Sequence, residues 1–390
     1  MREIDLDRLL EMMLDSNDGI SDLIFTVGRP LQVEAYGVLK PVIGDPAIAE
    51  LSSFQTEQIA LTLIGINGRL LLDLFATGSC DTSYQFGRKT RFRVNIFRQR
   101  GHFGIVMRKL AMDIPTVESL GLPTIFEEIV QEKNGLVLVT GATGSGKTTT
   151  LAAMLQMVNR TKAFHIVTLE DPIEFIHPHL QSTFSQRELG LDFDTYPNGV
   201  RASLRQAPKV ILIGEMRDRA TIEIALTAAE TGHLVFSTLH TVDAGQSINR
   251  VLGMFDRGEE EYLRTRLSDT LRYVVSQRLA PRVGGGRQLL LEIMGSNLRT
   301  RESIQQGESE GRTFNEIITD SSSQGWITFD QSILKAYEAD LITEETALIY
   351  STHKGQMRRA IDASKKARGL IDTREASGLK LDMDVKVDRY

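Results

Sequence analysis

The sequence contains a single cysteine, Cys80, among its 390 residues. One cysteine excludes an internal disulfide framework and a cysteine-based zinc cluster, because each of these needs at least two thiols. We therefore interpret Cys80 as a small residue of a hydrophobic core.

Long apolar runs and an excess of positive charge are also missing. No run approaches the roughly 18 apolar residues of a membrane span, and the first seven residues are acidic and lack the apolar core of a signal peptide. Lys and Arg number 45 against 51 Asp and Glu, which gives a formal net charge of −6. These absences predict a cytoplasmic protein that reaches any membrane through partners. They also disfavour a polyanion-binding protein, except through local basic patches.

A glycine-rich turn stands between a strand pattern and a helix pattern. Residues 141–149 read GATGSGKTT and match the phosphate-binding pattern G-x-x-x-x-G-K-[S/T]. The short apolar, β-branched run Gly135–Thr140 before it is typical of a buried strand, and the apolar residues of Lys147–Asn159 fall at helical spacing. A glycine turn that binds nothing is the alternative, and the presence of both flanking elements disfavours it.

Such a turn is suited to bind a triphosphate. Its glycines let backbone N–H groups point inward, and the following helix adds its positive end. Lys147 is expected to reach the β- and γ-phosphates, and the Thr148 hydroxyl to hold Mg²⁺. The residues expected to contact the nucleotide here are Gly141, Thr143, Gly144, Ser145, Gly146, Lys147, Thr148 and Thr149.

Acidic residues follow two of the expected strands. Glu170, Asp171 and Glu174 lie within five residues at the end of one strand, and Glu215 follows the strand Val210–Ile213 at the Walker B position. In an open α/β sheet the carboxyl ends of the strands face the ligand crevice, so these acids can polarise water or support Mg²⁺. A helix cap or a surface turn is the alternative for any one of the first three.

Two histidines flank another expected strand, Leu234–Thr238: His233 precedes it and His240 follows it. We interpret both as candidates to sense the γ-phosphate from the strand ends, with a structural role equally open. The pair His177 and His179 suggests a metal, but two histidines without further ligands favour a plain loop.

The patterns divide the chain into parts. Residues 1–110 combine helical and strand patterns between glycine turns, which predicts a small α+β domain. Residues 111–118 form the expected linker. In residues 119–295 strand and helix patterns alternate, which predicts an α/β domain with a mostly parallel sheet. Residues 296–368 have mainly helical patterns, and the charged tail 369–390 is expected to be mobile.

Strands are expected in the larger domain at Leu136–Thr140, His165–Leu169, Val210–Ile213, Leu234–Thr238 and Leu289–Ile293. Helices are expected at 147–159, 197–206, 219–230, 243–254 and Glu259–Ala280.

Together these segments resemble the motifs of the secretion ATPases of the type II and type IV pilus superfamily. Residues 141–149 are similar to the Walker A loop, 168–175 to the aspartate box, 210–218 to an unusual Walker B box and 230–240 to the histidine box. The resemblance extends over residues 1–368 and is strongest for the twitching-motility retraction ATPases of the PilT/PilU family. The absence of paired C-x-x-C motifs argues against the extension and type II secretion branches.

The resemblance implies a PAS-like N-terminal domain, a RecA-like ATPase domain and a helical C-terminal region. It implies ATP and Mg²⁺ as cofactors, with Thr148 and Glu215 near the metal and Glu170 and Asp171 near the nucleotide. Glu174 would activate the attacking water. Further catalytic roles are implied for Glu215, His233, His240, Arg91, Arg93 and Arg108. The three arginines would approach the phosphates from the N-terminal domain, where a fixed planar charge stabilises developing negative charge; a solvated strand face is the alternative.

One stretch departs from the PilT pattern. In residues 297–306 the first arginine is kept as Arg301, whereas glutamines stand at Gln305 and Gln306. The chain therefore looks more like the PilU-type members, which act as accessory retraction motors.

The implied function is a hexameric, ATP-hydrolysing motor for type IV pilus retraction. It would form a homo-hexamer, or assemble with a paralogous ATPase, and dock on an inner-membrane platform protein at the cytoplasmic side of the pilus base. An accessory ATP-binding subunit with weak activity of its own is the alternative. The acidic balance and the lack of a basic–aromatic stripe disfavour a nucleic-acid translocase.

Overall fold

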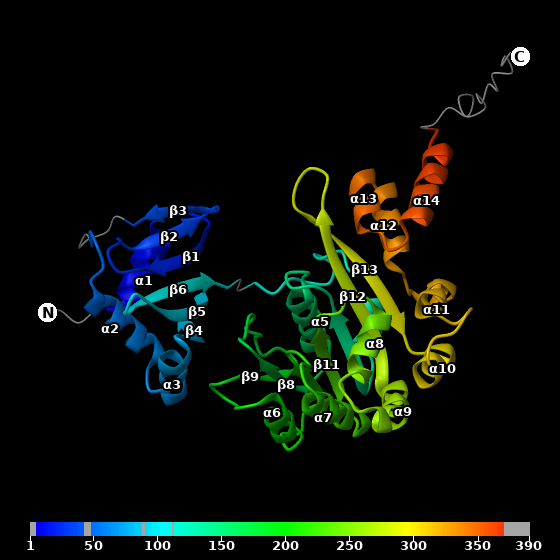
Figure 1. Ribbon diagram of the computed structural model, residues 1–390, viewed down its shortest axis with the longest axis horizontal. Coiled ribbons are helices and arrows are strands. Elements are labelled where there is room, and N and C mark those ends of the chain that lie inside the picture. The colour runs from blue at the N-terminus through cyan, green and yellow to red at the C-terminus, as the bar shows by residue number, and fades with distance from the viewer. Residues whose placement is uncertain (1–4, 43–47, 88–89, 111–112, 370–390) are drawn as a thin grey trace, which may run out of the picture. The chain divides into compact units, whose positions relative to one another are not determined.

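The computed structural model describes residues 5–42, 48–87, 90–110 and 113–369 (Figure 1). The chain divides into two compact units, and each is built from several segments. The first consists of Met1–Val139, Lys147–Leu239 and Asn249–Tyr273, and the second of Thr140–Gly146, His240–Ile248 and Val274–Tyr390. Residues 111 and 112 of the expected linker and residues 370–390 of the expected tail lie outside the described residues.

The first unit begins with a six-stranded antiparallel sheet in the order β3-β2-β1-β6-β5-β4. Its strands are β1 (Ile20–Phe25), β2 (Gln32–Ala35), β3 (Val38–Pro41), β4 (Ser79–Phe86), β5 (Thr90–Gln99) and β6 (His102–Lys109). Alternation along β5 buries Phe92, Val94 and Ile96 on one face, as the two-residue period of a half-buried strand requires.

Three helices accompany this sheet: α1 (Leu6–Asp15), α2 (Ser53–Ile64) and α3 (Gly68–Thr77). Ser52 and Gln55 form a capping box at the start of α2, which satisfies N–H groups that a helix cannot pair internally. The buried faces of these helices and of the sheet share one hydrophobic core, which includes Cys80. The interpretation of Cys80 as a core residue is thus confirmed.

The rest of the first unit carries parallel strands. β7 (Gly135–Thr140), β11 (Leu234–Leu239), β10 (Val210–Ile213), β8 (His165–Glu170) and β9 (Thr183–Glu188) follow one another in this order. β11, β10, β8 and β9 pair in parallel, and β7, β10 and β11 are buried along their whole length, as expected for strands covered on both faces. The accompanying helices are α4 (Ile125–Ile129), α5 (Lys147–Thr161), α6 (Tyr196–Ser203), α7 (Arg219–Glu230) and α9 (Glu260–Thr270).

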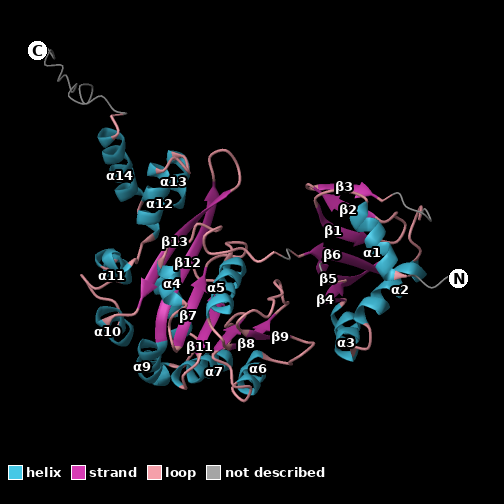
Figure 2. Cartoon of the chain, turned by 180° about the vertical axis from the view of Figure 1, so that it is seen from behind, coloured by secondary structure: helices cyan, strands magenta, loops and turns pink. Residues whose placement is uncertain are grey.

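The second unit contains the long neighbouring strands β12 (Leu271–Pro281, which begins in the first unit) and β13 (Arg287–Gly295), and the start of α8 (Ala244–Leu252). Its C-terminal helices are α10 (Leu298–Gln306), α11 (Phe314–Asp320), α12 (Phe329–Glu338), α13 (Glu344–Tyr350) and α14 (Lys354–Ala367). Figure 2 shows strands and helices in separate colours. α12, α13 and α14 share a small hydrophobic core with Ala280 of β12 and Leu290 of β13.

The mixed α/β fold expected from the sequence is confirmed, but one element was predicted wrongly. The helix expected over Glu259–Ala280 ends at Thr270, and the remainder is strand β12. Near their start, residues 271–281 carry the aromatic and β-branched run Tyr273, Val274 and Val275, which favours a strand. A short apolar run does not by itself distinguish a buried strand from a buried helix.

Candidate functional site

The phosphate loop needs its glycines. Gly141, Gly144 and Gly146 have φ angles of +143°, +79° and +92°, which L-residues rarely adopt. At Gly141 a Cβ atom would lie 2.5 Å from the carbonyl oxygen of Gln277 on β12. The turn therefore needs glycine for its backbone conformation, and it also packs closely against β12. A larger residue at position 141 would have to shift the loop or the strand.

The same loop holds an unused donor. The Ser145 side chain is only 5% exposed, and among the described residues its Oγ has no hydrogen-bond partner. A buried hydroxyl without a partner costs free energy, so a ligand oxygen that accepts from Oγ would remove this penalty. Thr143 and Gly144 are exposed beside it and open to solvent.

Lys147 is the first residue of α5 and is 9% exposed. Burial lowers the pKa of its ammonium, while the nearby carboxylates of Glu215 and Glu174 raise it. The lysine and the two acids that the sequence placed in one site are thus electrostatic neighbours in the first unit. Thr148 and Thr149 follow on α5 with half-buried side chains.

The acids after β8 occupy different environments. Glu170 is the last residue of β8 and is 8% exposed; its Oε1 accepts hydrogen bonds from Thr168 Oγ1 at 2.6 Å and from Gln186 Nε2 at 3.2 Å. Burial raises the pKa of Glu170 to about 7, and the hydrogen bonds oppose this rise. Asp171 is exposed, and partial desolvation raises the pKa of its carboxyl against the lowering effect of Arg217 and Arg93. Glu174 is half-buried.

Glu215 lies two residues after β10, which pairs in parallel with β8. Arg217 Nη2 forms an ion pair with Glu215 Oε1 at 2.5 Å. Tyr196, at the start of α6, lies close enough to these charges that Asp171 and Glu215, after burial, raise the pKa of its hydroxyl. Arg217 and Tyr196 were not found by sequence reasoning, although Arg217 stands only two residues after Glu215.

The two histidines do not lie together. His240 directly follows β11, whereas His233 directly precedes it. The His233 carbonyl accepts from Gly135 N, at the amino end of β7, and its ring Nδ1 is 2.9 Å from the Ala228 carbonyl oxygen. The interpretation that both histidines face one crevice is therefore corrected: a six-residue strand spans roughly 20 Å, and His233 is at the edge opposite the strand ends that carry the acids.

The three arginines share one face of the N-terminal sheet. Arg93 pairs in register with Arg108 across β5 and β6, and Arg91 lies two residues from Arg93 on the same face. Arg108 Nε binds Asp22 Oδ1 at 2.8 Å, and Arg93 is exposed. Arg91 differs from both, because it is engaged by a buried acid.

Glu188, the last residue of β9, is that acid. Arg91 Nη2 lies 2.6 Å from Glu188 Oε2, and the two side chains are 12% and 4% exposed. The Ser83 hydroxyl donates to Glu188 Oε1 at 2.7 Å, and Ile173 N donates to Oε2 at 3.2 Å. Since Ile173 precedes Glu174, Glu188 links Arg91 to the segment that carries the expected general base.

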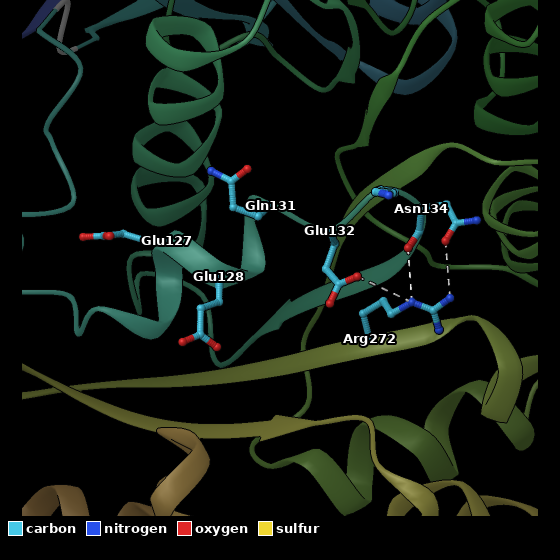
Figure 3. Close-up of a pocket in the computed structure, with 7 residues that line it drawn as sticks. Glu127, Glu128, Gln131, Glu132, Asn134 and Arg272 are labelled. Atoms are coloured by element: carbon cyan, nitrogen blue, oxygen red, sulfur yellow. Dashed lines mark hydrogen bonds and ion pairs between the residues drawn. The ribbon is translucent and has the colours of Figure 1, made fainter.

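A separate pocket of about 680 Å³ lies near the start of β7 (Figure 3). It is lined by Glu127, Glu128, Gln131, Glu132, Lys133, Asn134 and Arg272. Asn134 directly precedes β7, and Arg272 Nε donates to its carbonyl oxygen at 3.2 Å. The pocket is thus at the amino end of the strand whose carboxyl end leads into the phosphate loop, so it is distinct from the candidate site.

The remaining histidine pair, His177 and His179, takes part in packing and hydrogen bonding within the chain. His177 is buried, stacks on Phe184 with ring centroids 4.4 Å apart, and its pKa is lowered to about 4 by burial. His179 Nδ1 accepts a hydrogen bond from Phe184 N. Within the described ranges, no group of three or more His, Cys, Asp or Glu residues is arranged to hold a metal ion.

Comparison with known proteins identifies relatives along nearly the whole chain. The family model of type II/IV secretion system proteins matches residues 81–371. The type IV pilus ATPase PilU of Pseudomonas aeruginosa is 36% identical over 360 residues, which is 92% of this chain and 91% of the relative. The type IV pilus retraction ATPase PilT of the same organism is 38% identical over 345 residues, 88% of this chain and 97% of the relative.

Two solved structures also resemble this chain over nearly its whole length. The pilus retraction motor PilT with bound ADP superimposes with a TM-score of 0.80 at 37% identity, covering 92% of this chain and all of that one. The ATPase DotB of Legionella pneumophila gives a TM-score of 0.79 at 28% identity, over 90% and 95% of the two chains. In the part of the chain that the structure describes, no helix is both long and apolar enough to cross a membrane.

Proposed function

This chain belongs to the type II/IV secretion system protein family, as an ATPase similar to PilT and PilU, and from that premise we propose that it hydrolyses ATP to power the retraction of type IV pili. The observation that carries the proposal is the buried Lys147, which follows a strained glycine loop and has Glu174 and Glu215 as charged neighbours. A buried cation beside two acids has little value for stability alone, but it suits the transfer of a phosphoryl group.

The residues that would hold the nucleotide are the loop glycines, Ser145, Lys147, Thr148 and Thr149. The unpartnered Ser145 hydroxyl and the inward-turned backbone fit a phosphate oxygen in that place. Lys147 would neutralise the phosphates as a compact charge. Glu170 and Asp171 would line the same side, since β8 ends there.

Magnesium would be held by the Thr148 hydroxyl and, through the water network, by Glu215. Hydroxyl and carboxylate oxygens are ligands that Mg²⁺ prefers, and this ion usually keeps several waters, so few protein ligands are required. When bound, the ion would neutralise charge on the phosphates. Arg217 would hold the Glu215 carboxylate in place.

Glu174 would orient the attacking water and accept its proton. His240, which directly follows β11, would contact the γ-phosphate. Arg93 and Arg108 would approach the phosphates in the assembled motor, and Arg91 would do so after leaving Glu188. A planar guanidinium suits this task because it donates two parallel hydrogen bonds to oxyanions.

The assembly that we propose is a homo-hexamer, or a ring shared with a paralogous retraction ATPase, on an inner-membrane platform protein at the cytoplasmic side of the pilus base. Within each chain we propose residues 1–110 as the N-terminal domain, 119–295 as the ATPase core and 296–368 as the helical region. The short linker 111–118 would let the first two rotate when nucleotide is bound or released.

The test is ATP turnover by the purified 390-residue chain. We expect Lys147→Ala to abolish turnover, and Glu174→Gln to leave nucleotide binding intact while slowing hydrolysis at least a hundredfold. Lys162→Ala serves as the matched control: Lys162 lies just beyond the other end of α5 and donates to the Val130 carbonyl, so its loss should leave turnover unchanged. Wild-type turnover in both site variants would remove the enzymatic proposal.

A second candidate is an accessory subunit that binds ATP but hydrolyses little of it alone. The glutamines 305 and 306 on the exposed last turn of α10 favour it. Turnover by the chain without partners decides between the two, because robust activity of the isolated protein is incompatible with the accessory role. A deletion strain with excess surface pili and no twitching would support retraction in either case.

A further inference from the structure

Glu292 is a buried carboxylate outside the nucleotide site. It lies within β13, where it is 5% exposed between the buried residues Leu291 and Ile293. Burial disfavours the charged form of a carboxyl group, so such a residue needs partners that compensate.

Its partners are the first residues of two helices. Ala244 N donates to Glu292 Oε1 at 2.9 Å, and the main chain of Phe329 also forms a hydrogen bond with the carboxyl. Ala244 begins α8 and Phe329 begins α12. The first N–H groups of a helix have no acceptor within the helix, and the positive end of a helix favours an acidic group. One side chain therefore serves two helix starts that are far apart in sequence.

Other charged groups lie near the Glu292 carboxyl group. Arg278 on β12 lowers the pKa of Glu292, Asp243 raises it, and burial is the largest effect, which brings the pKa to about 7. Burial lowers the pKa of Arg278, and Glu292, Asp243 and Asp330 oppose this lowering. The carboxyl thus lies near the cation Arg278 and the acid Asp243, rather than in a purely apolar core.

On one side, Glu292 fixes the segment that carries His240. Only three residues separate His240 from α8. Thr241 Oγ1 is 2.6 Å from Ser247 Oγ, and Asp243 Oδ1 accepts from Gln246 N at 2.7 Å. These bonds tie residues 241–243 to the first turn of α8, so the position of that turn sets the path of the chain as it leaves His240.

On the other side, Glu292 holds the C-terminal helices. The guanidinium of Arg278 lies 3.8 Å from the centroid of the Phe329 ring, and its Nη1 donates to the Tyr350 carbonyl oxygen at the end of α13. Asp330, the next residue of α12, accepts from Thr352 N at 2.7 Å and from His353 N at 3.1 Å. α12 is therefore linked to α13 and to the start of α14.

We propose that Glu292 is a positioning residue that ties the His240 segment to the C-terminal helices α12–α14, so that ATP turnover depends on how these helices are held. The hydrogen bonds of Glu292 described above go to the starts of α8 and α12, outside the phosphate loop. The inference rests on the proposed function for its catalytic consequence, but the mechanical link between the two helix starts can be measured without turnover.

The experiment compares Glu292→Gln with the wild-type chain. Glutamine keeps the size and one acceptor oxygen but presents an NH₂ group to one of the two helix starts. We expect kcat to fall at least tenfold while KM for ATP changes less than threefold, because the phosphate loop is unchanged. Hydrogen exchange should rise together in peptides covering 241–248 and 326–333 and stay constant in residues 141–149.

The matched control is Glu308→Gln. Glu308 Oε1 accepts from Phe314 N at 2.7 Å, the first residue of α11, but Glu308 is exposed. This variant should raise exchange near the start of α11 and leave exchange in 326–333 and kcat unchanged. Glu308 also lies beside Gly245 of α8, where an added Cβ would be 3.8 Å from Glu308 Oε2, so the peptide 326–333 is the one that discriminates between the two variants. The comparison separates the loss of a carboxylate at one exposed helix start from the loss of the shared one.

A second variant, Asp330→Asn, loosens the C-terminal helices without touching Glu292. We expect it to raise exchange in 241–248 and to lower kcat at least threefold. An unchanged exchange rate in 241–248 in both variants overturns the link, and an unchanged kcat in both, with increased exchange, overturns its catalytic role. Absence of turnover in the wild-type chain counts against the proposed function instead, and the exchange measurements still decide the link.

Discussion

Replacing Glu170 by glutamine removes a charge while retaining the hydrogen bonds that the carboxyl makes. The Thr168 hydroxyl and the Gln186 amide both donate to Oε1, and glutamine offers a carbonyl oxygen in the same place. The variant therefore isolates the cost of ionising a carboxyl group that is buried at the end of β8.

The magnitude follows from the pKa. Burial raises the pKa of Glu170 from 4.5 to about 7, and one pKa unit corresponds to about 1.4 kcal/mol, so holding the ionised form costs roughly 3 kcal/mol. Between these two values the folded chain keeps a proton that the unfolded chain releases. The contribution of Glu170 to the wild-type free energy of unfolding therefore falls as pH rises from 4.5 to 7. The Glu170→Gln variant lacks this pH dependence, because glutamine does not ionise.

The assay is urea denaturation without nucleotide at pH 5, 7 and 8.5. We expect the free energy of unfolding of Glu170→Gln, minus that of the wild type, to grow with pH and to reach up to about 3 kcal/mol in favour of the variant above pH 7. Glu127→Gln, at an exposed position on α4, controls for the loss of one negative charge. If Glu170→Gln is instead destabilised at pH 8.5, the carboxyl is ionised and stabilised there, and the burial argument is refuted.

This result also bears on nucleotide binding. A protonated Glu170 can donate a hydrogen bond to a phosphate oxygen, whereas the ionised form repels it. If the stability of the variant grows with pH as expected, about half of the Glu170 carboxyl groups keep their proton at pH 7 in the absence of ligand. The protonated form suits a phosphate contact better than a metal contact.

Two further outcomes are expected. Gly141→Ala should lower nucleotide affinity at least tenfold in a fluorescence titration, because φ is +143° and the new Cβ would lie 2.5 Å from the Gln277 carbonyl oxygen; unchanged affinity would show that the loop shifts at no cost. Arg91→Ala should lower the free energy of unfolding by about 3–5 kcal/mol, since it leaves Glu188 buried with a charge unpaired. Arg69→Ala, which breaks an exposed pair, should cost under about 1 kcal/mol, and equal effects of the two would contradict the reasoning.

Much of the candidate site could be predicted because its parts are local in sequence. The phosphate loop, the acids after β8 and the glutamate after β10 each stand directly after a buried apolar run. Strand ends of a parallel sheet converge at one edge, so recognising the strands was enough to bring Lys147, Glu174 and Glu215 into one place.

It was harder to predict at which end of a strand a residue lies and which segments lie beside one another. His233 and His240 are seven positions apart, but a strand between them separates their two edges, and a residue pattern does not say which edge a turn belongs to. Similarly, Val274 and Val275 fit a helical pattern that continued from α9, although β12 begins at Leu271. In both cases the deciding information is the neighbouring strand, which is distant in the sequence.

The contacts that sequence reasoning missed share this property. Glu188 meets Arg91 across 97 positions, and Glu292 meets Ala244 across 48. Neither acid stands in a recognisable motif, yet each holds a segment that leads to an expected catalytic residue, Glu174 in one case and His240 in the other. Chains that share the four local motifs can therefore differ in how strongly turnover responds to the rest of the molecule. Exchanging acids of this kind between relatives, with the phosphate loop untouched, should change kcat more than KM.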